Sequence, residues 1–253
     1  NNDSVKNYLR QKGIPVKILA EYPNTNLLIV KLPWKMMDSL LPAQVVQFVD
    51  IPRKPKEEVA LSDYDICLNN INAVHSRLPQ INGNNLVVSV KENQFSLSDI
   101  DFRGRYMPTP LGSGETSPHA TIMATLIAGG GNSFYTGKGA AWGATLTTSS
   151  FASLLPDADA DYRRFNISVQ NHSYGTAVEN YYGADAAAYD ATVISNPALL
   201  HVFSAGNSGN ETSTSGKYSG ISNLANLTGS FKMAKNILTV GALDSFAVVA
   251  PLS

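Results

Sequence analysis

A histidine, a carboxylate and a side-chain amide lie in contexts where their side chains could support acyl-transfer chemistry. His119 follows Ser117-Pro118, a pair typical of a helix N-terminus, because serine caps the first free N–H groups and proline fits the first helical position. Glu92 and Asn207 each follow an apolar run of strand length. A carboxylate can orient an imidazole that acts as a general base, and an amide N–H can stabilise an oxyanion. These three side chains are the candidate catalytic residues.

For His119 alone, a second interpretation is a core histidine satisfied by a backbone carbonyl. Apolar residues recur after it at three- and four-residue spacing, which predicts a helix buried on most sides and ended by Gly129 and Gly130; they are Ile122, Met123, Leu126 and Ile127. Such a helix holds the imidazole rigidly under either interpretation. The choice depends on what the fold brings beside it.

Five apolar runs predict the sheet that would position these groups: 86–90, 144–149, 167–171, 200–205 and 237–242. A polar segment at 157–165 and helical patterns at 118–128 and 184–195 lie between them. Buried strands alternating with helices are typical of an α/β fold with a doubly wound, mostly parallel sheet. Ligands bind beyond the carboxyl ends of such strands, where Glu92, Asn207 and the polar segment 172–175 are expected.

Residues 1–58 show a different pattern, that of a small α+β domain. The spacing predicts a helix, a hairpin, a short helix and a last strand, at 4–12, 16–21 with 27–32, 34–41 and 45–51. The prolines and charges of 52–58 indicate an exposed linker. The larger domain is expected over 59–253, and its first helical pattern covers 64–77.

Composition excludes several classes of protein. The 253 residues carry a net charge of -1, and basic residues cluster only at Arg53-Lys54-Pro55-Lys56, so no nucleic-acid partner is expected. Apolar runs are too short to predict a transmembrane segment. The single cysteine, Cys67, excludes an internal disulfide.

Several segments, in consistent order, resemble the motifs of the subtilisin-like serine proteases. They are the first strand at 86–92, the histidine motif at 119–129, the Asn-x-Ser-x-Gly strand at 171–175, the oxyanion segment at 202–209 and the Thr-Val-Gly-Ala strand at 236–242. The likeness covers about residues 83–253. Residues 1–58 resemble the helix-and-hairpin propeptide that precedes this domain in the family.

The resemblance implies that His119 is the general base, that Glu92 occupies the position of the triad aspartate and that Asn207 donates to the oxyanion. An edge of the substrate cleft that binds an extended peptide by strand addition is implied at Ser173, Tyr174 and Gly175. His172 would be a cleft-wall residue. His75 and His201 match no motif and are expected to be structural.

Two departures from the family pattern leave alternatives open. Glu92-Asn93-Gln94 stands where the family has Asp-Thr-Gly or Asp-Ser-Gly, so Glu92 either orients His119 or is a solvated carboxylate after a strand. The Gly-Thr-Ser segment that carries the family's nucleophile does not occur before Ser253. Either the chain is the amino-terminal part of a longer protease precursor, or it is a catalytically inactive, protease-like module that binds a peptide or partner.

The first alternative implies a serine endopeptidase that cleaves extended peptides or proteins, secreted or held at the cell envelope. Its partners would be the peptide substrate, the downstream fragment of its own precursor and, at the surface, a larger complex. Residues 1–58 would inhibit it as a zymogen with 45–56 in the cleft, or would only be a packing domain. No cofactor is certain; calcium is a candidate through Asp99 or Asp101, whose alternative role is a solvated turn.

Overall fold

The computed structural model describes the chain except for residues 59–65, 180, 215–217, 224–226 and 253. It divides into two compact units, 1–52 and 53–253. Residues 53–58, placed by the sequence with the first domain, thus lie in the larger unit. Each unit is described by itself.

The small unit contains the expected helix, hairpin and short helix. Helix α1 spans Asn2–Gln11, strands β1 (Lys17–Tyr22) and β2 (Leu27–Lys31) pair antiparallel, and Trp34–Met36 (η2) leads into α2, Met37–Leu40. The 3-10 turn η1, Pro23–Thr25, joins the two strands. Leu9, Ile14 and Leu40 form the core of this unit.

The strand predicted at 45–51 is wrong, because these residues are irregular. Val46 and Val49 pack on the core around Leu9 without a ladder. Since β1 and β2 pair only with each other in the described structure, this segment has no strand to pair with. The next strand is β3, Lys56–Glu57, in the larger unit.

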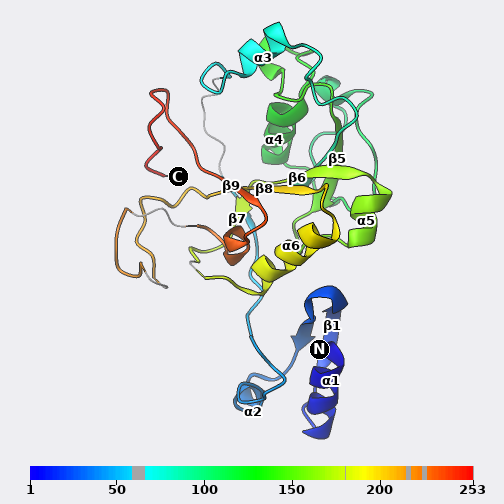
Figure 1. Cartoon of the computed structure of the whole chain (residues 1–253), viewed down its shortest axis with the longest axis vertical. Helices are drawn as coiled ribbons and strands as arrows, with labels where there is room; N and C mark the ends of the chain where they lie inside the picture. Colours follow the sequence, from blue (N-terminus) through cyan, green and yellow to red (C-terminus); the bar gives the residue numbers. More distant parts are fainter. Residues whose placement is uncertain (59–65, 180, 215–217, 224–226, 253) are drawn as a thin grey trace. The chain divides into compact units, whose positions relative to one another are not determined.

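The larger unit is built on a five-stranded parallel sheet, which confirms the predicted α/β architecture (Figure 1). Its order is β5-β4-β6-β8-β9, and the strands are β4 (Val87–Glu92), β5 (Thr145–Ser150), β6 (Ile167–His172), β8 (Leu200–Ser204) and β9 (Leu238–Val240). All four neighbouring pairs are parallel, so their carboxyl ends share one edge.

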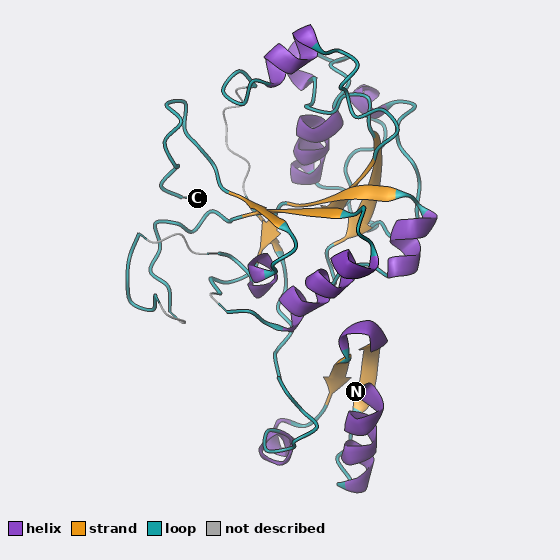
Figure 2. Ribbon diagram, viewed as in Figure 1, coloured by secondary structure: helices purple, strands orange, loops and turns teal. Residues whose placement is uncertain are grey.

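Helices cover both faces of this sheet (Figure 2), with α4 (Pro118–Ala128) on one side and α5 (Asp159–Arg164) and α6 (Ala184–Ser195) on the other. The other helical segments among the described residues of this unit are α3 (Ile71–Arg77) and the short turns η3 (Ile100–Phe102), η4 (Tyr135–Gly137) and η5 (Ser230–Met233). The helix predicted at 64–77 forms only as α3. Residues 64 and 65 lie outside the described residues, and Asn70 has a φ of 57°, a left-handed conformation that a right-handed helix cannot continue through.

Alanines, rather than the larger apolar residues, form the buried face of α4. Ala120, Ala124 and Ala128 are fully buried against the sheet in a core with Val90. Ile122 is 46% exposed, so the expectation that this helix is buried on most sides is wrong. Residues at a spacing of four share a face, and small side chains on that face let α4 lie close to the sheet.

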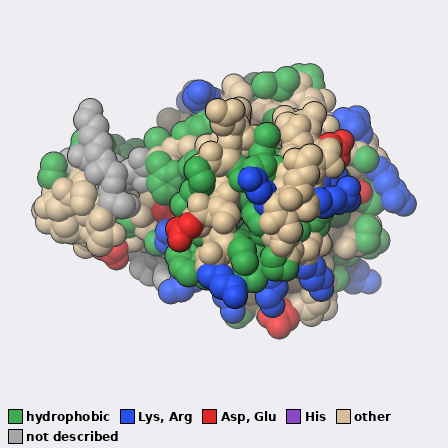
Figure 3. All heavy atoms as spheres, turned by 90° about the horizontal axis from the view of Figure 1, so that it is seen from below, with side chains coloured by type: hydrophobic (Ala, Val, Ile, Leu, Met, Phe, Trp, Pro, Cys, Tyr) green, Lys and Arg blue, Asp and Glu red, His purple; other side chains and the backbone are tan. Residues whose placement is uncertain are grey.

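On the other face, Tyr174, Tyr189, Phe203 and Phe231 form a buried aromatic cluster. The outer strand β9 still exposes Leu238 and Val240 by about half. In the view of Figure 3, lysine and arginine side chains are interspersed with apolar and neutral ones. Among the described residues, no helix has the length and hydropathy needed to cross a membrane.

Candidate active site

His119 and Glu92 form a hydrogen-bonded pair. Glu92 ends β4, and His119 is in the first turn of α4, where the Ser117 hydroxyl accepts hydrogen bonds from the N–H groups of His119 and Ala120. The distance from Glu92 Oε2 to His119 Nδ1 is 2.7 Å, and the Glu92 side chain is fully buried. Glu92 is therefore not a solvated carboxylate, and the Nδ1 partner of His119 is a carboxylate rather than a backbone carbonyl.

This pairing fixes which nitrogen of the imidazole can accept a proton. With a carboxylate at Nδ1, the neutral ring carries its proton there and leaves Nε2 as the basic atom. Nε2 is buried and makes no hydrogen bond of good geometry within the described residues. The arrangement suits a general base.

Nearby carboxylates change the pKa of both groups. Burial alone would lower the pKa of His119, but the hydrogen bond and charge of Glu92, the charge of Glu57 and the Glu58 backbone outweigh it and raise that pKa. Burial raises the pKa of Glu92, helped by the charge of Glu57 and opposed by His119. The protonated imidazole is thus favoured while Glu57 stays beside it.

Residues 56–58 lie along the predicted cleft edge. Strand β3 pairs antiparallel with β7 (Tyr174–Gly175), with Lys56 opposite Gly175 and Glu57 opposite Tyr174. The pairing continues as Glu58 N–H donates to the carbonyl of Ser173 at 3.3 Å. The segment Ser173–Gly175 therefore holds an extended peptide by strand addition, and in this structure that peptide is the chain's own.

The Glu57 side chain lies close to the Glu92–His119 pair. Asn93 Nδ2 donates to Glu57 Oε1 at 3.2 Å, and ligand atoms of Glu57, Glu92 and His119 all lie within 4.8 Å of one another. These three residues could hold a divalent cation by their donor types. The Glu92 to His119 hydrogen bond already uses one ligand atom of each of these two residues.

The Glu58 side chain turns into a buried polar pocket. Lys232 Nζ lies 3.0 Å from Glu58 Oε1, and the hydroxyls of Ser204 and Thr228 donate to the same carboxylate. A Cβ at Gly175 would lie 2.2 Å from Glu58 Oε1, so only glycine allows this approach. The site thus binds both the backbone and the side chain of Glu58.

Asn207 lies three residues beyond β8, at the sheet edge where β4 and β6 also end, as the sequence predicts. Its side chain is exposed. Gly206 before it has a φ of 123°, and a Cβ there would lie 2.4 Å from Thr228 Oγ1. The structure therefore pairs Glu92 and His119 directly and places Asn207 at the same edge, two strands from β4.

The expectation that His172 lines the cleft wall is wrong. His172 is fully buried, with Nδ1 3.0 Å from Tyr174 Oη and Nε2 3.0 Å from His201 Nδ1, and its ring stacks on Phe203. Burial lowers its pKa well below the usual range and lowers that of His201 to about 3. Both rings stay neutral, and His201 is structural as expected.

His75 and the two aspartates considered for calcium have local contacts. His75 Nε2 lies 3.1 Å from the Ala140 carbonyl. Asp99 caps η3 by accepting from the Asp101 N–H, and the Asp101 carboxylate accepts from the Asn132 N–H and from the N–H and hydroxyl of Ser133. Asp101 thus ties two loops together, and no calcium ligand is assigned.

Sequence reasoning missed Glu57, Glu58 and Lys232. The run Lys56-Glu57-Glu58 looks like the end of a charged linker. The segment expected in the cleft, 45–56, ends two residues before Glu58. No sequence signal marks Lys232, because a lone lysine before a strand is usually on the surface.

Comparisons with known proteins identify the family of this chain. Residues 83–253 match the profile described as "Subtilase family", and the chain belongs to that family of serine proteases. No curated protein matches the sequence.

Three solved structures show the same fold at low sequence identity. Fervidolysin from Fervidobacterium pennivorans, a keratinolytic enzyme related to subtilisin, is similar with a TM-score of 0.60 and 17% identity over 96% of this chain and 42% of its own. The prenylagaramide maturation protease PagA has a TM-score of 0.53 and 17% identity over 72% of this chain and 62% of its own. The PatG macrocyclase in complex with peptide has a TM-score of 0.50 and 12% identity, over 77% of this chain and 68% of its own.

Proposed function

We propose that this chain is the amino-terminal part of a subtilisin-like serine endopeptidase in its unprocessed, self-inhibited form. One observation carries the proposal: a carboxylate-bound imidazole lies beside a cleft edge that already holds an extended segment of the same chain. The family supplies the reaction class. The localisation that goes with this proposal is secretion or the cell envelope.

In this proposal His119 Nε2 takes the proton from a serine hydroxyl as its oxygen bonds to the carbon of the scissile amide. His119 then gives the proton to the leaving nitrogen as the C–N bond breaks, and water hydrolyses the resulting ester by the same route. Glu92 orients the imidazole and stabilises its cation. Asn207 donates to the oxyanion.

The nucleophilic serine comes from a further segment of the precursor in this proposal. The apolar side chains exposed on β9, Leu238 and Val240, support a further layer of protein beside that strand. The larger unit therefore offers a surface on which such a segment can pack.

Residues 1–58 act as an inhibitory propeptide in this proposal. The strand pairing of 56–57 with 174–175 supports it, because a substrate would need the same backbone groups. Occupation by an internal segment keeps the cleft closed until the chain is cut.

Active-site labelling of the natural full-length protein tests the proposal. A serine-directed phosphonate is expected to label the protein after its amino-terminal segment has been removed, and the label should disappear in His119→Ala. His75→Ala is the matched control, because the His75 ring hydrogen-bonds to the Ala140 carbonyl, away from the Glu92–His119 pair, and its loss should leave labelling unchanged.

The second candidate is a catalytically inactive module that binds a peptide. The glutamate in the triad position, buried and with a raised pKa, favours it, because a carboxyl that protonates more readily orients histidine less well. Absence of labelling in a full-length protein that carries a downstream Gly-Thr-Ser segment would support this candidate and contradict the endopeptidase.

A further inference from the structure

We infer that Lys232 selects an acidic side chain, glutamate above all, immediately before the scissile bond, and that Glu58 fills this position in the unprocessed chain. The inference rests on the proposed function, since it names the substrate preference of that same site. It also assigns the bond between Glu58 and Val59 as the site of self-processing.

The backbone contacts place Glu58 at the reacting position. Its N–H donates to the Ser173 carbonyl, one residue beyond the β3 pairing with Tyr174–Gly175. After the Glu92 and Glu57 carboxylates, the Glu58 backbone is among the groups that raise the pKa of His119, so it lies beside the imidazole. In this inference the scissile bond is therefore the one that follows Glu58 in the sequence.

The side chain of Glu58 is recognised by a built pocket. Lys232 Nζ bonds to Glu58 Oε1 at 3.0 Å and to Thr228 Oγ1 at 2.7 Å, with Ser204 Oγ 3.4 Å away. The Ser204 hydroxyl donates to the other carboxylate oxygen. Three donors around one carboxylate, one of them charged, form a recognition site for an anionic side chain.

Burial makes this pocket selective. The Lys232 side chain is 0% exposed, and within the described residues Glu58 is the one carboxylate paired with it. When residues 56–58, the tail, leave the cleft, the Lys232 ammonium loses its anion, which is unfavourable unless another carboxylate takes the place. An apolar side chain would leave the charge unpaired, and a basic one would add a like charge.

Side-chain length separates glutamate from aspartate. Glu58 reaches Lys232 past Gly175, where a Cβ would lie 2.2 Å from Glu58 Oε1 and 2.5 Å from Thr228 Oγ1. The passage is therefore narrow. Aspartate is one methylene shorter and leaves its carboxylate short of Lys232.

The processing step is an ordinary hydrolysis. The C–N bond between Glu58 and Val59 breaks, the Glu58 carbonyl carbon gains the oxygen of water as a carboxylate, and the Val59 nitrogen gains a hydrogen as an amine. The serine of the further segment first forms an ester with the Glu58 carbonyl carbon, and water then hydrolyses this ester, as in the proposed function. No oxidant or metal is consumed.

Peptide substrates test the preference on the full-length protein after activation. Peptides that follow residues 53–62 carry Glu, Gln, Asp, Leu or Lys at the position of Glu58, and kcat/KM is measured for each. Glutamate is expected to exceed glutamine by about tenfold or more, the factor that one charged hydrogen bond supplies. Mass spectrometry should place the new amino terminus at Val59.

A variant pair assigns the preference to Lys232. Lys232→Met is expected to reduce the preference for glutamate over glutamine to about onefold, and the exposed Lys235→Met should keep it. The wild-type peptide series needs no variant, so a Lys232→Met chain that fails to fold leaves the test intact. A preference for leucine over glutamate, or processing elsewhere, in a protein that hydrolyses peptides and takes the phosphonate would overturn the inference and leave the protease standing.

A binding measurement separates failure of the inference from failure of the proposed function. If no peptide is cut and no label is taken up, fluorescence anisotropy is measured with a labelled peptide of residues 53–58 and the Glu58→Ala protein, whose own tail is weakened. A loss of about tenfold in affinity when the last residue of the peptide becomes glutamine supports the acidic pocket without catalysis. Equal affinity for both peptides overturns it.

Discussion

Two buried lysines in the larger unit each form an ion pair with a carboxylate. The two pairs are buried to nearly the same extent, but their carboxylates come from different parts of the unit. Lys91 Nζ lies 2.7 Å from Asp157 with side chains 1% and 12% exposed, and Lys232 Nζ lies 3.0 Å from Glu58 with side chains 0% and 11% exposed. By distance and exposure the pairs are close to equal. They differ in what holds the carboxylate.

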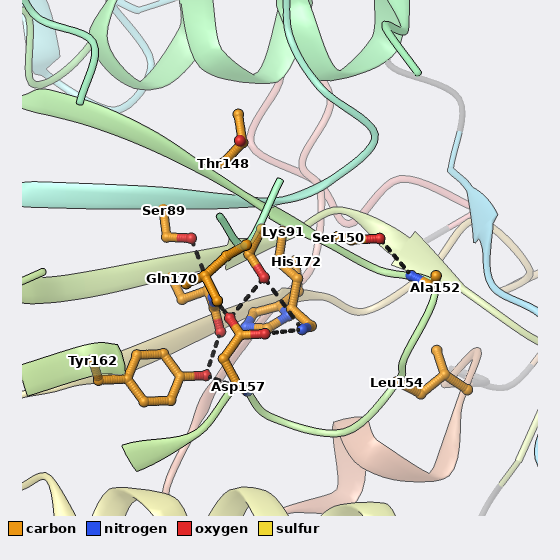
Figure 4. A network of polar contacts seen from close by, with 12 residues as sticks. Ser89, Lys91, Thr148, Ser150, Ala152, Leu154, Asp157, Tyr162, Gln170 and His172 are labelled. Carbon is orange, nitrogen blue, oxygen red and sulfur yellow. Dashed lines mark hydrogen bonds and ion pairs between the residues drawn. The ribbon is translucent and has the colours of Figure 1, made fainter. Parts of the chain in front are cut away.

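Asp157 lies between β5 and α5, and its carboxylate is held by side chains of the folded sheet. Ser149 Oγ and Gln170 Nε2 donate to its carboxylate at 2.6 and 2.8 Å, and its own N–H donates to the Tyr162 hydroxyl (Figure 4). Burial alone would raise the pKa of Asp157, but Lys91 and these donors outweigh it and lower that pKa. Every one of these partners comes from the sheet or from α5.

Glu58 instead follows a strand of two residues, whose ladder is the pairing with Tyr174–Gly175. Its hydrogen-bonding partners lie on the cleft side, at Ser204, Thr228 and Lys232. Burial lowers the pKa of Lys232, and the Glu58 carboxylate opposes that shift. The comparison teaches that a buried ion pair belongs to the core only when both charges are anchored by the fold.

The largest expected difference between the pairs is in stability. Asp157→Ala should lower the free energy of unfolding of the larger unit by about 3–5 kcal/mol, because the Lys91 ammonium remains buried without its carboxylate. Glu58→Ala should cost about 1 kcal/mol, since the tail can leave and water can reach Lys232 through the cleft. Urea unfolding followed by circular dichroism measures both.

Asp161→Ala is the control for this pair of variants. Asp161 lies in the first turn of α5, where its carboxylate favours the helix dipole, and its loss should cost about 0.5 kcal/mol. Equal losses in Asp157→Ala and Glu58→Ala would show that Glu58 is as much part of the core as Asp157. The distinction between the two pairs would then fail.

A smaller effect is expected on the accessibility of the tail. Glu58→Ala should speed trypsin cleavage between Lys56 and Glu57 by about tenfold, because the lost charged hydrogen bonds hold that segment in its strand. The measurement uses a His119→Ala background, so that trypsin is the only protease, and follows the fragments by mass. Glu115→Ala, at an exposed glutamate of the same unit, should leave the rate unchanged; an equal rate in Glu58→Ala would mean that the carboxylate does not hold the tail.

The same contrast explains what the sequence could predict. The five strands follow from apolar runs, and the Glu92 to His119 pair follows from a strand end and a capped helix start, because these signals are local. The buried face of α4 is different, since Ala120, Ala124 and Ala128 carry no strong apolar signal. Their burial depends on how close the helix lies to the sheet.

Long-range pairing is what the sequence could not supply. Residues 45–51 have strand composition but no strand to pair with, whereas Lys56–Glu57 have linker composition and pair with Tyr174–Gly175. The pocket around Lys232 joins residues 58, 204, 228 and 232 across the chain. Nothing in the local pattern of a single charged residue indicates such a partner.

The smallest expected effect is on the protonation of His119. It tests whether the tail inhibits through the charge of Glu57 as well as by occupying the cleft. Glu57 raises the pKa of both His119 and Glu92, so Glu57→Gln should lower the pKa of His119. Proton NMR can follow the imidazoles, because the chain has four histidines and His172 and His201 stay neutral. Glu115→Gln should leave the titration of His119 unchanged.

The sign of this effect also predicts the pH dependence of stability. Because the native pKa of His119 is raised above its unfolded value of about 6.5, the stabilisation is fully present below that pH and is lost as pH rises through the native pKa. Glu57→Gln should move the pH at which this stabilisation is lost to a lower value. An unchanged titration would show that Glu57 does not act on His119, and the tail would then inhibit by occupying the cleft alone. A lowered pKa would mean that removing the tail also leaves His119 Nε2 unprotonated, and so able to accept a proton, at lower pH.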